Sequence, residues 1–197
     1  MFFQFTAKFA KNDCLGTREV LAEDDEVQKN GKVFKKLHLG EYKWLKYGEM
    51  AKQAARIGNG LRAIGLKPGD KIAILAETRA DWMLTAYACF KNNITIVTIY
   101  ATLGTDGVKH ALTETKAPVL VCSQETIGKV KEVENDCPHL KKVIVMSSLM
   151  LTSSETTITK ERLEFDDLKK YPENTDTSAQ EPTPEVINYS VAPVVSN

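Results

Sequence analysis

The chain has 197 residues with 26 basic and 26 acidic side chains, so its formal net charge at pH 7 is zero. This balance gives no electrostatic reason to expect nucleic acid as a partner. The composition, 43% hydrophobic and 26% charged, is typical of a globular domain, and no run approaches the ~18 apolar residues that a membrane span needs.

The first 40 residues are predicted to be a polar approach segment. Residues 23–26 are four consecutive acids, a pattern typical of a solvated loop. Residues 1–5 are apolar but short, so we interpret them as a frayed terminus, with a weak interfacial anchor as the alternative. Aromatic and basic residues then alternate from Tyr42 to Tyr47, which favours an edge strand.

Residues 48–65 are predicted to form an amphipathic helix that ends at Gly65. The residues of its inner face recur at steps of three and four, and are Met50, Ala54, Ile57, Leu61 and Ile64. Gly58 and Gly60 match a loose dinucleotide fingerprint, but that motif needs a turn between a strand and a helix. We therefore expect these small residues to let the helix pack closely on a neighbour.

Strands and helices then alternate along the chain. Strands are expected at 71–76, 94–100, 119–122 and 143–146. The helices between them are expected from a capping box of Thr78 and Asp81 to Phe90, from a cap at Thr105 through Val108, Ala111 and Leu112, and over 124–134 with Ile127 and Val130 inward. This order predicts an α/β fold, a partial doubly wound and mostly parallel sheet with helices on both faces.

The character of the chain changes after residue 147. Residues 147–159 are rich in Ser and Thr, and residues 160–171 are expected to form a short amphipathic helix through Leu163 and Leu168. From Pro172 the composition indicates a linker with no further clear element. The expected organisation is therefore an approach segment over 1–40, an α/β subdomain over 41–147 and a Ser/Thr/Pro-rich connection over 148–197.

The cysteines and histidines indicate no metal site. None of the four cysteines has a spacing typical of a zinc site or a redox pair, and the three histidines share no ligand spacing. Cys89 and Cys122 fall inside apolar runs, where cysteine commonly acts as a small buried hydrophobe. We therefore expect a reducing, cytosol-facing environment.

Candidate binding residues lie where the predicted strands end. Ligands of open α/β sheets collect beyond the carboxyl ends of the strands, which makes Thr78, Tyr100 and Thr102 candidates for ligand contact, although no ATP-binding residue is predicted in this chain. The competing interpretation is that these residues cap helices and close turns. No glycine-rich phosphate loop and no acid–base pair accompanies them, so no catalytic residue is predicted.

Several ordered blocks resemble the long-chain acyl-CoA synthetases of the acyl-adenylating superfamily. The blocks are CLGTR at 14–18, NGKVFKK at 30–36, GLKPGDKIAI at 65–74, ETRADWM at 77–83 and YATLG at 100–104. The resemblance covers about residues 13 to 185 and implies the AMP-binding ligase domain. It also implies ATP-dependent ligation of a long-chain fatty acid to coenzyme A through an acyl-adenylate, with Mg²⁺ at the phosphates.

The family's phosphate loop is expected soon after a Pro-Thr-Pro stretch, which stands here at 182–184. The residues that follow depart from the loop pattern, so we expect a truncated chain that is inactive by itself and that self-associates through uncovered sheet surface. The alternatives are a non-catalytic isoform acting as an interaction fragment, and a stand-alone nucleotide-binding domain. The resemblance also implies membrane association of the complete enzyme, on the endoplasmic reticulum or the mitochondrial outer membrane.

Overall fold

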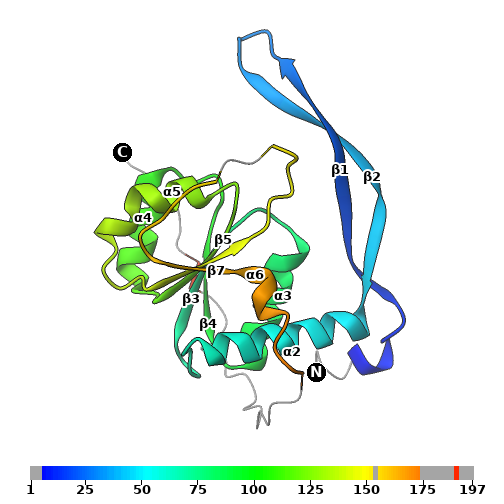
Figure 1. Cartoon of the computed structure of the whole chain (residues 1–197), viewed down its shortest axis with the longest axis vertical. Helices are drawn as coiled ribbons and strands as arrows, with labels where there is room; N and C mark the ends of the chain where they lie inside the picture. The colour runs from blue at the N-terminus through cyan, green and yellow to red at the C-terminus, as the bar shows by residue number, and fades with distance from the viewer. Residues whose placement is uncertain (1–5, 153–154, 174–188, 191–197) are drawn as a thin grey trace.

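The computed structural model describes residues 6–152, 155–173 and 189–190. Its first large element is an antiparallel hairpin of β1 (Asp13–Val27) and β2 (Val33–Lys46), which extends away from the rest of the molecule (Figure 1). The acidic loop expected at residues 23–26 is wrong, because these residues lie in β1. Almost every β1 residue is exposed, so the strand lacks the alternation that marks a half-buried strand. The boundary expected at residue 40 falls inside β2.

Helix α2 (Tyr47–Ala63) follows the hairpin and confirms the predicted amphipathic helix. Met50, Ile57 and Leu61 are fully buried. The helix ends in a Schellman motif: Gly65 takes a left-handed conformation with φ 108°, and the Leu66 N–H donates to the Leu61 carbonyl at 3.1 Å. The predicted stop at Gly65 is therefore confirmed.

The two glycines inside α2 allow close packing, as predicted. Gly58 lies against the Asn92 side chain, and a Cβ atom at Gly60 would stand 2.8 Å from Leu168 Cδ2. Both glycines are buried within the helix, where their N–H groups are not available to a pyrophosphate.

A parallel sheet forms the centre of the molecule, with strand order β7-β6-β5-β3-β4-β8. Every adjacent pair of strands in this sheet is parallel. The strands are β3 (Lys71–Leu75), β4 (Thr95–Ile99), β5 (Val119–Ser123), β6 (Lys142–Met146), β7 (Glu161–Glu164) and β8 (Tyr189–Ser190).

Helices cover both faces of this sheet, which confirms the predicted α/β architecture (Figure 1). The remaining helices are α3 (Ala80–Lys91), α4 (Thr105–Thr115), α5 (Ile127–Val133), the 3₁₀ turn η1 (Glu134–Asp136) and α6 (Phe165–Leu168). Helices α2, α3 and α6 share one hydrophobic cluster with the sheet, and α4 and α5 share the other. Alternate residues of each central strand enter opposite clusters, as Ile72 and Ala73 of β3 do.

Two predicted helix caps are wrong. Helix α3 has Arg79 at its N-cap and no side-chain cap, so Thr78 and Asp81 form no capping box. Helix α4 has Gly104 at its N-cap, and the Thr105 hydroxyl instead donates to Glu132 Oε2 at 2.7 Å.

The helix expected over residues 160–171 is also wrong, because β7 occupies its first half. The buried Glu134 carboxylate accepts hydrogen bonds from the backbone N–H groups of Thr159 and Lys160, which directs the chain to the sheet edge. Phe165 and Leu168 of α6 then fill the cluster beside α2. The expectation of no element after residue 172 is wrong as well, because β8 pairs with β4; residues 174–188 lie outside the described residues.

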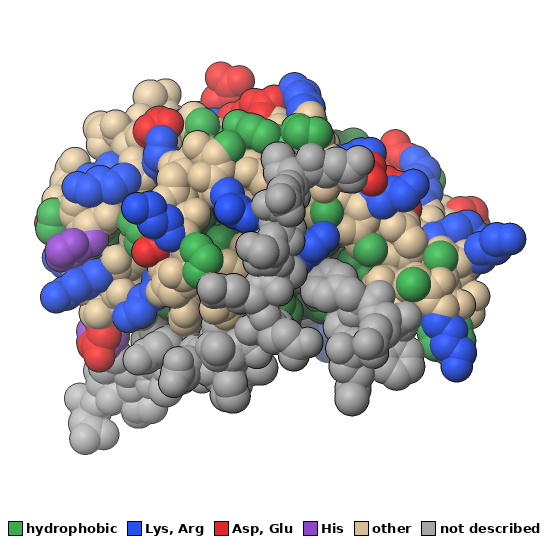
Figure 2. All heavy atoms as spheres, turned by 90° about the horizontal axis from the view of Figure 1, so that it is seen from below, with side chains coloured by type: hydrophobic (Ala, Val, Ile, Leu, Met, Phe, Trp, Pro, Cys, Tyr) green, Lys and Arg blue, Asp and Glu red, His purple; other side chains and the backbone are tan. Residues whose placement is uncertain are grey.

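Figure 2 shows basic, acidic and hydrophobic side chains interspersed on the face seen from below. Among the described ranges, no helix combines the length and the apolar character needed to cross a membrane.

Candidate functional site

The carboxyl ends of β3 and β4 are neighbours in the sheet. Helix α3 leaves β3 toward one face, and helix α4 leaves β4 toward the other. Because the two connections diverge, a crevice opens between the neighbouring strand ends, where ligands of open α/β sheets bind. The strand order itself reverses between β3 and β5, so the choice of the β3 and β4 ends rests on the cavity found there.

A cavity of about 470 Å³ occupies that crevice. Residues from the end of β3, the start of α3 and the end of β4 line it, namely Ala76, Glu77, Thr78, Arg79, Trp82, Met83, Thr98, Ile99, Tyr100, Ala101 and Thr102. We call it the strand-end pocket. Its walls are largely apolar, and among its lining residues Glu77 carries the one carboxylate and Arg79 the one full positive charge.

All three candidates from the sequence line this pocket. Thr78 and Thr102 are exposed, and Tyr100 keeps 62% of its surface accessible. The structure thus brings together two segments that are separated by about one βα unit in the chain. The other strand ends make structural contacts: Ser148 donates to Glu125 at 2.6 Å, and the Gln124 N–H donates to the Met146 carbonyl at 3.1 Å.

Arg79 is a site residue that the sequence did not single out. Its side chain is only 4% exposed, and its guanidinium joins two elements. One terminal nitrogen donates to the Ser147 carbonyl at 2.9 Å, and the other donates to Asp81 Oδ2 at 2.7 Å. Arg79 therefore fixes the start of α3 against the end of β6, which holds one wall of the pocket.

Two buried polar atoms of the pocket have no hydrogen-bond partner among the described residues. They are Arg79 Nε, a donor, and Glu77 Oε2, an acceptor. Buried polar groups of folded proteins are nearly always satisfied by protein or water. Both atoms have almost no accessible surface, so they lie behind the lining of the open pocket and are not presented to a ligand.

Lys169 extends the same network to α6. Its Nζ lies 3.0 Å from Asp81 Oδ1 and 2.8 Å from Asp166 Oδ1. Burial opposes the charge of Lys169, but hydrogen bonds and charge from Asp166 and Asp81 outweigh it and raise the lysine pKa above its ordinary value. Asp81 is thus held by two cations from opposite sides.

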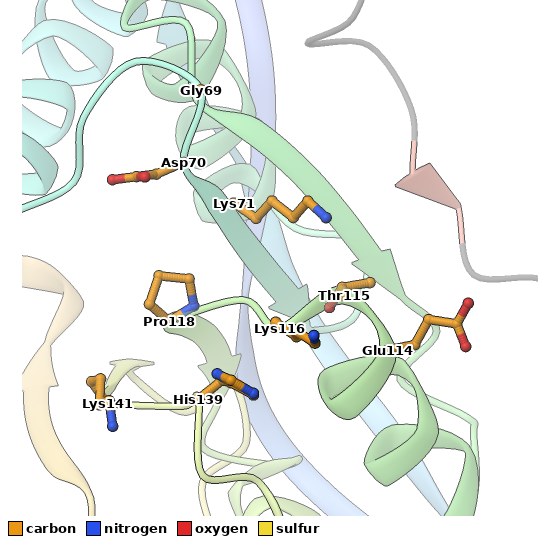
Figure 3. Close-up of a pocket in the computed structure, with 9 residues that line it drawn as sticks. All are labelled: Gly69, Asp70, Lys71, Glu114, Thr115, Lys116, Pro118, His139 and Lys141. Atoms are coloured by element: carbon orange, nitrogen blue, oxygen red, sulfur yellow. The ribbon is translucent and has the colours of Figure 1, made fainter.

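A second cavity, of about 650 Å³, lies at the opposite, amino ends of the strands. Charged side chains surround it, but they do not converge: in Figure 3, Asp70 and Lys71 point to opposite sides, and Glu114 points away. An anion or a metal ion would need several of these groups to face one point. The strand-end pocket is therefore the stronger candidate site.

Residues 23–190 match the AMP-binding enzyme family. The chain belongs to this family. The chain is 36% identical over 144 residues to long chain acyl-CoA synthetase 8 of Arabidopsis thaliana, which covers 73% of this chain and 20% of that protein. It is 41% identical over 98 residues to long-chain-fatty-acid–CoA ligase 1 of Schizosaccharomyces pombe, and this match covers 50% of this chain and 14% of that protein. These figures confirm the resemblance to long-chain acyl-CoA synthetases, and the chain spans a fifth or less of the length of these two relatives.

Solved structures share the fold of this AMP-binding enzyme segment. The adenylation domain of a carboxylate reductase from Mycobacterium chelonae superposes with a TM-score of 0.67 at 16% identity, covering 92% of this chain and 30% of that one. An anthranilate CoA ligase in complex with anthranoyl-AMP superposes with a TM-score of 0.61 at 20% identity. This superposition covers 71% of this chain and 25% of the other. At this identity the likeness establishes the architecture alone.

Proposed function

We propose that this chain is part of an ATP-dependent long-chain fatty acid–CoA ligase that works through an acyl-adenylate. The observation that carries the proposal is the family match over residues 23–190, together with relatives named as long-chain acyl-CoA synthetases. The strand-end pocket, at the carboxyl ends of two parallel strands, is then one wall of the substrate cleft.

The reaction has two steps. A fatty acid carboxylate attacks the α-phosphorus of ATP, which forms the acyl-adenylate and releases pyrophosphate. The thiol of coenzyme A then attacks the acyl carbon, which forms the thioester and releases AMP.

The residues of the strand-end pocket suit the uncharged part of a substrate. Its walls are largely apolar, and the Glu77 carboxylate in its lining repels a triphosphate. A triphosphate needs a nest of backbone N–H groups or converging cations, whereas both terminal nitrogens of Arg79 already bind protein groups. The pocket therefore supports contact with an acyl chain, with Thr78, Tyr100 and Thr102 at its rim.

The described residues do not by themselves fit Mg²⁺. No three His, Cys, Asp or Glu side chains gather into a metal-binding group within the described part of the chain. We propose that the metal and the phosphates are held by other parts of the complete enzyme. The 197-residue chain alone then forms no acyl-CoA and binds ATP weakly.

Two measurements test the properties proposed for the 197-residue chain. ATP- and CoA-dependent acyl-CoA formation should not exceed a blank without protein, and titration calorimetry should detect no micromolar, Mg²⁺-dependent ATP affinity. Acyl-CoA formation by the purified chain would contradict the proposal that other parts of the complete enzyme hold the metal and the phosphates.

A chimera tests the proposed function directly. The matched segment of the Arabidopsis relative is replaced by the corresponding residues of this chain. The chimera should convert a long-chain fatty acid to its acyl-CoA. A folded chimera that forms no acyl-adenylate would count against the proposal.

A second candidate function is a non-catalytic fragment that associates with complete subunits. The exposed hairpin favours it, because Trp44, Tyr42 and Leu21 each keep half or more of their surface accessible. Co-purification of the chain with a full-length ligase would support this function, and the chimera assay separates the two. We propose a cytosol-facing location in either case.

A further inference from the structure

The first turn of helix α5 contacts both of the strand ends that form the strand-end pocket. Thr126, at the N-cap of α5, is buried, and its hydroxyl donates to the Leu75 carbonyl at the end of β3 at 2.8 Å. Three residues further along, Lys129 reaches the segment that follows β4, residues 100–104, which we call the rim segment. The start of α5 therefore braces the two halves of the pocket against each other.

The Lys129 ammonium binds two carbonyl groups of the rim segment. Its Nζ donates to the Ala101 carbonyl at 2.5 Å and to the Leu103 carbonyl at 2.8 Å. Thr102, which lines the pocket, lies between these two carbonyls in the chain, whereas Lys129 is not among the lining residues. Because one charged group holds the backbone on both sides of Thr102, Lys129 fixes the position of this threonine from behind the pocket wall.

The rim segment depends on such contacts because none of its residues is buried. Its Leu103 N–H donates to the Tyr100 carbonyl at 3.0 Å, which closes a turn. Helix α5 makes a second contact just beyond the segment, where the Thr105 hydroxyl donates to Glu132 Oε2 at 2.7 Å. Lys129 is therefore the α5 side chain that holds the rim segment itself.

We propose that Lys129 is a positioning residue of the strand-end pocket, which holds the rim segment where it contacts an acyl chain. The inference rests on the proposed function, which assigns this pocket to the acyl chain. Loss of the ammonium releases two carbonyls, and the rim segment then no longer keeps Thr102 beside the end of β3. The rim lies along the substrate's uncharged part, so its contacts are equal in the ground state and the transition state. Loss of Lys129 therefore raises KM and leaves kcat unchanged.

Hydrogen exchange in the full 197-residue chain tests the hold on the rim segment without any activity. In Lys129→Met the Leu103 amide should exchange about tenfold faster, because two charge-assisted hydrogen bonds no longer keep its turn closed. Lys129→Gln, which is shorter and uncharged, should show the same change. Lys129→Arg should restore slow exchange, because a guanidinium can donate to both carbonyls. Lys131→Met, at an exposed position of the same helix, is the control and should exchange as the natural chain does.

Steady-state kinetics of the chimera with the Arabidopsis relative test the consequence for the substrate. Lys129→Met should raise KM for a long-chain fatty acid about fivefold and keep kcat within about twofold, and Lys129→Arg should return KM toward its original value. A change that merely destabilised the fold would lower the amount of active enzyme, and with it kcat, at an unchanged KM.

The proposal is overturned if KM does not change, or if Leu103 exchanges in Lys129→Met and Lys129→Gln as slowly as in the natural chain. An unmodified chimera that forms no acyl-CoA contradicts the proposed function instead. The exchange measurement then still decides whether Lys129 positions the rim segment.

Discussion

Arg79 is the side chain that holds the strand-end pocket together. It is almost completely buried, and it connects the end of β3, the start of α3 and the end of β6 through Asp81 and Ser147. Sequence reasoning found Thr78, Tyr100 and Thr102 because strand ends are where ligands collect. It missed Arg79 because a charged residue after a strand looks like a solvated turn. The one signal was its place three residues after the continuous apolar run over 72–76.

Replacing Arg79 with methionine should destabilise the fold. The change leaves the Ser147 carbonyl without its donor and Asp81 without its closest cation. Removing one partner of a buried pair costs about 3–5 kcal/mol, and we expect about 2–4 kcal/mol here because Lys169 still neutralises Asp81. Urea unfolding measures the loss. Arg62→Met, on the exposed side of α2, should change the free energy of unfolding by less than about 0.5 kcal/mol.

Lys169 should make stability depend on alkaline pH. Its folded-state pKa lies above the ordinary value of 10.5, so the protonated form favours the folded state. This contribution is complete below pH 10.5 and is lost as the pH rises through the higher folded pKa. The difference in unfolding free energy between the natural chain and Lys169→Met should therefore shrink above that pH. An unchanged difference up to pH 12 would show that Lys169 acts through packing of its stem.

At the scale of elements, helix α2 was predictable and the hairpin was not. The inner face of α2 repeats apolar residues at helical spacing, and Ile57 and Leu61 are buried as that spacing requires. The hairpin strands expose both faces over most of their length, so no period of two marks them. The sequence predicts one helix where β7 and α6 stand, because Leu163 and Leu168 suit either structure. Tertiary contacts, such as the one from Glu134 to Thr159, decide between them.

Leu61→Ala should weaken the packing of α2. Leu61 is fully buried in the cluster that α2 shares with α3, α6 and the sheet. Truncation of a buried leucine costs about 2–5 kcal/mol, depending on how far the site collapses. Chemical denaturation should show this loss, with Lys52→Ala on the exposed face of α2 as the control. A loss as small as the control's would place α2 outside the cooperative core.

At the scale of the whole molecule, the parallel sheet and its helical layers follow from the alternation of strands and helices in the sequence. The strand order does not follow from that alternation, because the direction of each crossover depends on which face of the sheet its helix covers. The sequence therefore placed the candidate residues at strand ends, but it could not show that the ends of β3 and β4 are neighbours. That neighbourhood places Thr78, Tyr100 and Thr102 in one candidate site.

Self-association of the chain stays a prediction, but its expected surface moves from the sheet to the hairpin. β8 pairs with β4, so β4 is not an edge strand. The hairpin strands have long unpaired edges beside exposed apolar side chains, and such edges template association with a second chain. Light scattering after size exclusion should show a mass above 21.9 kDa at tens of micromolar chain. Phe34→Lys should lower that mass, and a monodisperse natural monomer would contradict the prediction.

The strand-end pocket as part of the substrate cleft is the central claim, and filling the pocket tests it most directly. In the chimera with the Arabidopsis relative, Thr102→Trp places a large ring at the rim, whereas Thr17→Trp adds the same ring to an exposed hairpin position. The account predicts that Thr102→Trp lowers kcat/KM for a long-chain fatty acid at least tenfold, about 1.4 kcal/mol of transition-state stabilisation, with an unchanged melting temperature. The kcat/KM of the Thr17→Trp chimera should stay within about twofold of that of the unmodified chimera. A Thr102→Trp chimera that keeps full activity would contradict the claim.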